Sequence, residues 1–308
     1  MNKLSHLGKV ARSISKGLLA ILLLVNASHA KLTIASYNIR TFDSKNSTTD
    51  KVALKKIMLS MKADFITVEE IVNANSFKAF IKSQFPNYAL HLSKCGGGGK
   101  QKIGFLYLKS KFKLKKAYED SRISDPRQVV GKYGCGRLRP ALVGVFTHLK
   151  TREEFVAIGL HLKAGGSPKN YSQRARQYDV LARLVDELRL ADHQNIILMG
   201  DFNTTGFLAQ DADFVNFKSM LSNMNLETSS KDIQCTSYWS GKNRQDNLEE
   251  PSVLDHVVYP RKLLGGTFKR VNLFAHCKAS KCERKSSSEL GVSYRKVSDH
   301  CPVTITYQ

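Results

Sequence analysis

The sequence predicts an α/β fold in which strands and helices form packed layers. Segments with the alternating pattern of strands recur along the chain, and segments with helical spacing of apolar residues lie between them. No linker rich in Pro, Gly or Ser divides the chain, and no internal repeat is visible. Residues 31–308 therefore suit one large α/β domain.

The first elements follow from periodicity. Leu32–Asn38 alternates as a strand does. A helix is expected next, because apolar residues recur at i, i+3, i+4 and i+7 from Leu54, with Thr49 or Asp50 available as its N-cap. Asp64–Glu70 then predicts a second strand, and the order strand, helix, strand begins the α/β pattern.

The remaining elements alternate in the same way. In Phe155–Leu162, His161 shares one face with small residues while the larger apolar side chains share the other. A long amphipathic helix is expected from about Ser172 to Leu190, with an apolar stripe typical of a core position. Further strands are expected at Ile103–Tyr107, Ala141–Phe146, Ile196–Met199, Val253–Tyr259 and Val303–Tyr307, and a further helix near Phe214–Met224.

Residues 1–30 have the pattern of a signal peptide. Four basic residues precede or open an apolar run at Gly17–Val25, and Ser28-His29-Ala30 offers the small residues of a cleavage site. The apolar run is shorter than the roughly 20 residues that a membrane-spanning helix needs. We therefore expect cleavage after Ala30, a secreted or periplasmic protein and no membrane insertion of the mature form, with a retained N-terminal anchor as the alternative.

The charge balance indicates a polyanionic partner. The formal net charge is +22, and because residues 1–30 hold four basic and no acidic residues, the mature chain carries +18. A surface this basic attracts and steers polyanions, although the same charge also serves solubility. Charge alone does not separate nucleic acid from an anionic membrane.

All six cysteines lie after residue 30, which in an exported protein favours disulfides. Cys277 and Cys282 are the nearest candidates for a local pair. His276 beside them leaves a zinc site as an alternative, although no second ligand pair has the spacing of a structural zinc site. Cys301, between a histidine and a proline, is the cysteine expected to be free and buried.

Polar side chains follow several of the predicted strands. Asp201 and Asn203 come directly after the apolar run Ile196–Met199 and Gly200, and at positions i and i+2 of an extended chain they point to the same side. A polar turn is the simpler interpretation. Similar polar residues stand at or next to other strand ends, at Asn38, Glu70, His161 and Asp299-His300.

Taken together, these residues and the short sequences around them resemble the endonuclease/exonuclease/phosphatase superfamily, and most of all pancreatic-type deoxyribonucleases and their bacterial secreted relatives. The resemblance covers residues 31–308. It implies a four-layer α/β sandwich of two packed mixed β-sheets flanked by helices. It also implies a divalent cation and cleavage of phosphodiester or phosphomonoester bonds. The phrases that carry it are Ser36–Phe42, Val68–Ile71, Gly159–Leu162, Met199–Asn203, Ser252–Val257 and Ser298–Val303.

The resemblance also implies roles for individual residues. Asp201 and Asn203 match the pair that positions the attacking water and the phosphate. Glu70 and Asp299 match carboxylate ligands of the metal, to which Asn38 adds a neutral oxygen, or else a donor to the phosphate. The proton-transfer pair would be His161 and His300, with Asp255 orienting the second histidine.

Two positions depart from the pancreatic pattern. Gln101 stands where those enzymes have a glutamate that holds the first histidine, and a neutral amide stabilises imidazolium less than a carboxylate does. The groove arginine falls on Leu138, so that one of the flanking Arg137 and Arg139 would replace it. Tyr171, Arg174 and Gln177 resemble, more loosely, the start of a helix beside the phosphate groove.

These observations predict a monomeric, metal-dependent endonuclease of low sequence specificity, with DNA favoured over RNA as substrate and Mg²⁺ as the ion. Mn²⁺ and an additional structural Ca²⁺ stay open. One alternative is a phospholipid or inositol-phosphate phosphodiesterase of the same superfamily, with Trp239, the single tryptophan, as its membrane contact. Another alternative is a non-catalytic cationic binding protein or toxin subunit.

Overall fold

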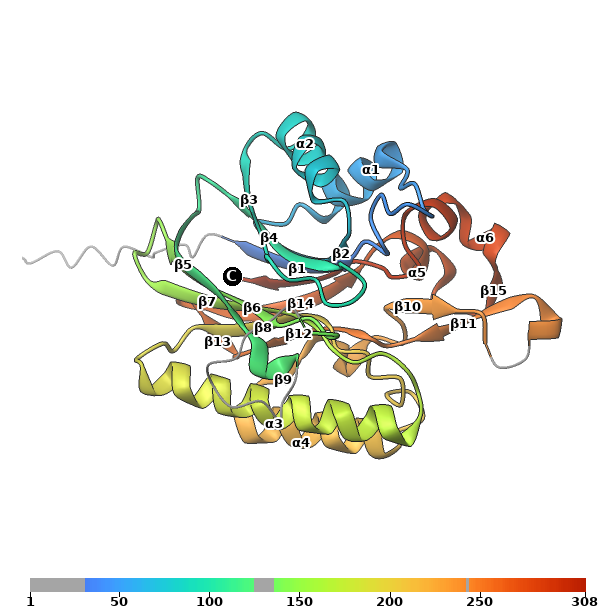
Figure 1. The fold of residues 1–308 in the computed structure, drawn as a ribbon. Helices are drawn as coiled ribbons and strands as arrows, with labels where there is room; N and C mark the ends of the chain where they lie inside the picture. The colour runs from blue at the N-terminus through green and yellow to red at the C-terminus, as the bar shows by residue number, and fades with distance from the viewer. Residues whose placement is uncertain (1–30, 125–135, 242–243) are drawn as a thin grey trace, which may run out of the picture.

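The structure is a computed structural model, which describes residues 31–124, 136–241 and 244–308. The predicted signal peptide and Cys135 lie outside the described residues. Two large β-sheets pack face to face, and helices cover both outer faces, so the molecule has four layers (Figure 1). The predicted four-layer sandwich is confirmed.

The first sheet has seven strands in the order β13-β14-β16-β1-β2-β4-β3. Its central strands β1 and β2 are parallel, whereas β16 and β4 pair antiparallel with them. Neighbouring carboxyl ends of β1 and β2 therefore meet at one edge. The strand bounds are β1 Leu32–Asn38, β2 Phe65–Ile71, β3 Tyr88–Leu92, β4 Lys102–Leu108, β13 Lys262–Leu263, β14 Gly266–Leu273 and β16 Val303–Tyr307.

The second sheet has six strands in the order β5-β6-β7-β8-β12-β9. Here β7 and β8 are parallel neighbours, and β12 runs antiparallel to β8. The end of β8 therefore lies beside the start of β12. The bounds are β5 Phe112–Asp120, β6 Ala141–His148, β7 Glu154–His161, β8 Ile196–Asp201, β9 Glu227–Thr228 and β12 Asp255–Tyr259.

The interface between the two sheets is rich in phenylalanine. Phe65 of the first sheet meets Phe146 and Phe155 of the second edge to face, with ring centroids 4.9 and 5.2 Å apart. All three side chains are fully buried. Aromatic pairs in this geometry stabilise a core beyond the area they bury, so the sheets, and the strand ends that carry the polar residues, are held in a fixed relation.

Four helices cover the outer faces (Figure 1). On the first sheet lie α1 (Lys51–Met61) and α2 (Ala74–Gln84), and on the second lie α3 (Pro168–Leu190) and α4 (Ala212–Met224). Asp50 caps α1 by accepting from the backbone N–H groups of residues 52 and 53, which settles the choice between the two predicted N-caps. The long helix begins four residues before the expected start, because Ser167 caps it and proline suits its first turn.

A small third sheet and two short helices follow in the C-terminal part. The sheet has the order β10-β11-β15, with β10 Ser237–Trp239, β11 Leu248–Ser252 and β15 Lys285–Ser286. The helices are α5 (Ala275–Ser280) and α6 (Ser287–Val292). Short 3₁₀ turns lie at Ser121–Ile123, Ser229–Asp232 and Arg244–Asp246, and a π-helical turn at Ser293–Val297.

Two disulfides fasten this part, and they correct the predicted pairing. Cys235 is bonded to Cys282, and Cys277 is bonded to Cys301. The expected local bridge from 277 to 282 is wrong because residues 281 and 282 adopt left-handed backbone conformations that end α5 and turn the chain away. The expectation that Cys301 is free is also wrong. A zinc site at His276 is excluded in this state, since both neighbouring sulfurs form a disulfide.

No helix among the described residues has the length and apolar character needed to cross a membrane.

Candidate active site

Five strand ends bring the predicted polar residues to one edge of the sandwich. Asn38 ends β1, Glu70 lies one residue before the end of β2, His161 ends β7 and Asp201 ends β8. His161 and Asp201 are register partners in the parallel pair, and Asp255, at the start of β12, is the register partner of Asp201 across the antiparallel pair. The pairing of parallel and antiparallel strands thus gathers residues that lie far apart in sequence.

The two sheets meet at this edge through side-chain contacts. Asn38 Nδ2 donates to Asp201 Oδ2 at 3.1 Å and lies 3.3 Å from Glu70 Oε1. His161 Nε2 lies 3.5 Å from Asp201 Oδ2 and 3.7 Å from Glu70 Oε1. Asp201 itself accepts from the backbone N–H of Asn203 at 2.8 Å. A carboxamide, an imidazole and two carboxylates therefore surround one small region.

His300 reaches the same region from the turn before β16. Its Nδ1 lies 2.8 Å from Asp255 Oδ2, and its Nε2 lies 3.9 Å from Asp201 Oδ2. The predicted contact between Asp255 and His300 is therefore present. Asp255 is fully buried and His300 is 8% exposed. One ring nitrogen is thus fixed by a carboxylate, and the other is directed to the centre of the cluster.

The two histidines have opposite electrostatic environments. Burial, Arg139 and His300 lower the pKa of His161 well below its ordinary value. Burial alone would lower the pKa of His300 too, but Asp255, Asp201 and Asp299 raise it well above its ordinary value. Burial also raises the pKa of Asp201 to about 7. A neutral and a cationic imidazole therefore flank one carboxyl group.

Unusual backbone conformations position two of these side chains. Glu70 and Asn203 have φ values of 62° and 54°, in the left-handed region that residues with a side chain rarely adopt. Gly200 lies on β8, opposite Leu160 of the parallel strand β7. It has φ of 145°, and a Cβ there would lie 2.0 Å from the carbonyl oxygen of Leu160. Only glycine fits immediately before Asp201, so the motif's glycine is required by the close approach of β7.

The donor set fits a divalent cation of the Mg²⁺ type. Ligand atoms of Glu70, His161 and Asp201 lie within 4.8 Å of one another, as do those of Asp201, Asp255 and His300. Carboxylate oxygens are the ligands that Mg²⁺ prefers. Glu70 and Asp201 are the residues placed to hold such an ion.

Two predicted metal ligands are placed differently. Asn38 turns its carboxamide nitrogen to the carboxylates, while its oxygen accepts from the backbone N–H of Arg40 at 3.0 Å. It is therefore a donor to the carboxylates here, and its expected role as a donor to the phosphate stays a prediction. Asp299 belongs to neither group of ligand atoms; its Oδ1 lies 3.8 Å from Arg40 Nε.

Of the two candidate groove arginines, Arg139 is the one at the site. Its Nη2 donates to the backbone oxygen of Leu162 at 2.8 Å, directly after His161. Burial lowers its pKa, while the carboxylates of Asp201 and Glu70 oppose that shift. Its Nε is buried without a partner among the described residues. Arg137, by contrast, is exposed, and its backbone oxygen accepts from Gly98.

Arg174 does not face a substrate groove, which corrects the prediction. Its side chain is fully buried and donates to both carboxylate oxygens of Asp213, at 2.9 and 2.7 Å. It also donates to the carbonyl oxygens of residues 163 and 165. Gln177 is likewise buried in backbone contacts. Arg174 therefore joins α3 to α4, and only Tyr171, whose ring lies 5.1 Å from the Arg174 guanidinium, stays partly exposed.

Gln101 does not hold His161, which corrects a second prediction. His161 Nδ1 is buried with no hydrogen-bond partner among the described residues. The side chain of Gln101 instead lies over Gly99 in the turn before β4. The imidazole ring therefore lacks the orienting group that Asp255 supplies to His300, which agrees with the lowered pKa of His161.

Three residues at this edge were not assigned a role from the sequence. Glu69 is fully buried beside Ser36 Oγ, and Ser298 Oγ donates to the backbone oxygen of Asn38 at 2.7 Å. Arg40 lies against Asp299. The signal for all three was their position within the matched phrases, next to or near residues that were assigned.

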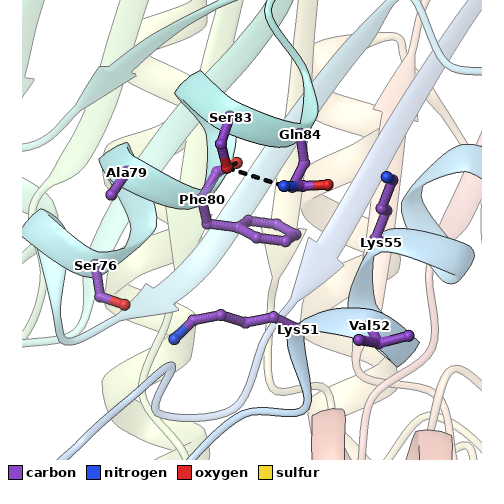
Figure 2. A pocket seen from close by; sticks show the side chains of 8 residues that line it. All are labelled: Lys51, Val52, Lys55, Ser76, Ala79, Phe80, Ser83 and Gln84. Atoms are coloured by element: carbon purple, nitrogen blue, oxygen red, sulfur yellow. Dashed lines mark hydrogen bonds between the residues drawn. The ribbon is translucent and has the colours of Figure 1, made fainter.

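One hollow on the surface lies away from this edge. It has a volume of about 610 Å³ and lies between α1 and α2 (Figure 2). Lys51 lines this hollow, but its ammonium group is already paired with a carboxylate, since Nζ lies 2.6 Å from Asp43 Oδ2. None of its lining residues belongs to the cluster at the strand ends. The chemistry of the site therefore has to be judged from the cluster's geometry and not from the size of a cavity.

The four-layer sandwich with this cluster at its strand ends defines the class of the protein. Residues 35–300 match the model of the Endonuclease/Exonuclease/phosphatase family, and the chain belongs to that family. It is similar to Deoxyribonuclease-1 of Bos taurus, with 24% identity over 286 residues that cover 89% of this chain and 92% of that protein.

Solved structures share the fold. An endonuclease/exonuclease/phosphatase from Bacteroides vulgatus has a TM-score of 0.62 at 17% identity, covering 90% of this chain and 98% of that one. D. rerio TDP2, complexed with single strand DNA product, has a TM-score of 0.60 at 15% identity, covering 91% of this chain and 99% of that one.

Proposed function

We propose that the protein is a secreted or periplasmic, Mg²⁺-dependent endonuclease that hydrolyses DNA with low sequence specificity, as a monomer. The observation that carries the proposal is the convergence of two histidines on one carboxylate, with His161 and His300 at 3.5 and 3.9 Å from Asp201 Oδ2. The similarity to Deoxyribonuclease-1 of Bos taurus supports DNA as the substrate.

The chain's own residues divide the work of hydrolysis. Water attacks phosphorus and gives up a proton to the neutral imidazole of His161, the bond from phosphorus to the leaving oxygen breaks, and that oxygen takes a proton. Asp201 and Asn203 orient the water and the phosphate. His300, fixed through Nδ1 by Asp255, donates from Nε2 to the phosphate or the leaving oxygen. A divalent cation, when bound by Glu70 and Asp201, neutralises negative charge on the phosphate.

The charge of the mature chain supports a long polyanion over a small substrate. Its formal charge of +18 is spread over many lysines and arginines, without one basic reading helix. Contacts of this kind to the phosphate backbone supply most of non-specific nucleic-acid affinity. Low sequence specificity follows from the same distribution.

The proposed location rests on two features of the chain. Residues 1–30 have the pattern of a signal peptide, and the disulfides between residues 235 and 282 and between 277 and 301 belong in an oxidising compartment. The mass of the protein recovered from periplasm or culture fluid tests this: it should begin at Lys31. Recovery of a stable exported form that retains Met1 would contradict the proposal.

One assay tests the activity. The purified mature protein is incubated with plasmid DNA, RNA and a choline phospholipid, each in Mg²⁺ and in EDTA. Nicking and fragmentation of DNA in Mg²⁺ only is the expected result. His300→Ala should abolish most of it, whereas His193→Ala is the matched control, because His193 pairs with Glu154 on the surface. Release of the lipid headgroup without DNA cleavage would refute the nuclease proposal.

A further inference from the structure

A small arm of the molecule is attached directly to the turn that carries His300. The arm is the third sheet, β10-β11-β15, which projects beside α5 and α6 (Figure 1). Ser237 of β10 forms a bridge pair with His300, and the backbone N–H of Tyr238 donates to the oxygen of Asp299 at 2.9 Å. The backbone N–H of Cys301 donates to the oxygen of Thr236 at 2.7 Å. The position of β10 is therefore fixed relative to the active site.

The last residue of this strand is an exposed tryptophan. Trp239 is 43% exposed, whereas its neighbour Tyr238 is 1% exposed and bonds through its hydroxyl to Ser280 and Glu283. Alternation along the strand puts Trp239 on the same face as Ser237. It lies two residues, roughly 7 Å of strand, beyond the residue that pairs with His300. An indole ring is therefore offered to solvent at the edge of the site.

The surroundings of Trp239 are polar and charged. Its cross-strand partner is Glu250, which lies 3.5 Å from Arg284. On the segment that β10 joins, Arg295 is exposed, and its backbone oxygen accepts from the guanidinium of Arg40 at 3.3 Å. Within the described part of the arm, Trp239 is the only large apolar side chain that is exposed.

This combination fits a nucleobase better than a lipid surface. Insertion into a membrane requires a patch of apolar side chains, whereas one aromatic ring among charges suits a single flat ring next to a phosphate. A base presents its face only when it is unstacked, in a single strand or at a frayed end.

We propose that Trp239 is a base-stacking subsite, and that it gives the enzyme a preference for single-stranded or frayed nucleic acid. The inference rests on the proposed nuclease function, because the phosphate attached to the stacked base is the one that reaches the cluster at Asp201 and His300. The stacking contact is tolerant of sequence, since every base has a π-face.

The single tryptophan makes the contact directly observable. The mature protein in EDTA is titrated with oligothymidylate, with a blunt DNA hairpin of equal phosphate number, with polyphosphate, and with phosphatidylglycerol vesicles. Saturable quenching of tryptophan emission by oligothymidylate, weaker quenching by the hairpin and none by polyphosphate are expected. Quenching that is absent, or equal for oligothymidylate and polyphosphate, overturns the inference. A blue shift with vesicles overturns it in favour of a lipid surface.

Variants provide the second test. Trp239→Ala should weaken binding of a labelled single strand about 5- to 150-fold, the range found when one stacked base is lost, while Trp239→Phe should retain most of it. Leu190→Ala is the matched control, because Leu190 is 89% exposed at the end of α3. Unchanged single-strand affinity in a folded Trp239→Ala protein overturns the subsite.

Hydrolysis of a small phosphodiester without a base separates the two proposals. Trp239→Ala should cleave it at the wild-type rate in Mg²⁺. If wild type cleaves it and Trp239→Ala also retains its preference for single strands, only the subsite is wrong. If wild type cleaves neither this substrate nor DNA, the proposed function itself fails.

Discussion

Removing the disulfide between Cys277 and Cys301 should lower turnover by more than it lowers the folded fraction. Cys301 directly follows His300, and Cys277 lies on α5, whose His276 Nε2 lies 3.4 Å from the backbone oxygen of Asp299. The bridge therefore fastens the turn that places His300 against Asp255. Without it, we expect the imidazole to sample positions away from Asp201.

The two disulfides give a quantitative contrast. The bridge from 277 to 301 spans 24 residues, and that from 235 to 282 spans 47. By the loop-entropy relation, taken for each loop alone, these are worth about 3.5 and about 4 kcal/mol of unfolding free energy. The Cys235→Ala/Cys282→Ala protein should thus lose at least as much stability as Cys277→Ala/Cys301→Ala, while the latter should lose more activity.

Urea denaturation gives the two stabilities, and kcat on a small phosphodiester in saturating Mg²⁺ gives the two activities. Circular dichroism shows that each variant is folded under the assay conditions. We expect the Cys277→Ala/Cys301→Ala protein to have the lower kcat although it is at least as stable as the other variant. A general loss of folding cannot produce this result. A folded Cys277→Ala/Cys301→Ala enzyme with wild-type kcat would refute the claim that this bridge positions His300.

Four further predictions concern the site and the core. His300→Ala should lower kcat by at least about 100-fold, because the acid–base contribution of the imidazole is lost. The urea concentration at the midpoint of unfolding should change little. Glu70→Gln should raise the Mg²⁺ concentration for half-maximal hydrolysis, and high Mg²⁺ should restore part of the rate. Burial lowers the pKa of His256 from 6.5 to about 3, so below pH 6.5 the unfolded chain binds a proton that the folded chain does not. The free energy of unfolding is therefore highest above pH 6.5 and should fall by about 3 kcal/mol at pH 4.5. His256→Asn should show a shallower loss of unfolding free energy over this range in urea titrations. The affinity for DNA in EDTA, measured by fluorescence polarisation, should fall steeply with salt, and a flat response would argue against backbone contacts.

Much of the fold could be predicted because local pattern and tertiary structure agree. The apolar spacing from Leu54 and the two candidate N-caps specify α1 before any packing is known, and the alternation of Leu32–Asn38 specifies β1. The pairing of Asp255 with His300 could be predicted for another reason. Both residues belong to phrases of a known family, and the resemblance supplied the three-dimensional contact that periodicity cannot.

The remaining errors concern contacts between distant segments. Arg174 looks like any basic residue at the start of a helix, and only the packing of α4 shows that Asp213 neutralises it in the core. The disulfides depend on where α5 ends, which is set by the left-handed residues 281 and 282. Gln101 occupies the expected position in the sequence, but its turn directs it over Gly99 instead of toward His161.

The acidic character of the site explains why so basic a chain is needed around it. Asp201, Asp255 and Glu69 are buried together, and burial with mutual repulsion raises the pKa of Glu69 well above its ordinary value. A phosphodiester is repelled by those carboxyl groups of this centre that are ionised. The buried Arg139 and the partly exposed Arg40 offset part of this repulsion, and the +18 charge expected of the mature chain would attract a polyanion at long range. We therefore expect binding of a nucleic acid to depend on the widespread basic residues, and its cleavage to depend more strongly on Arg139 and Arg40 near the cluster.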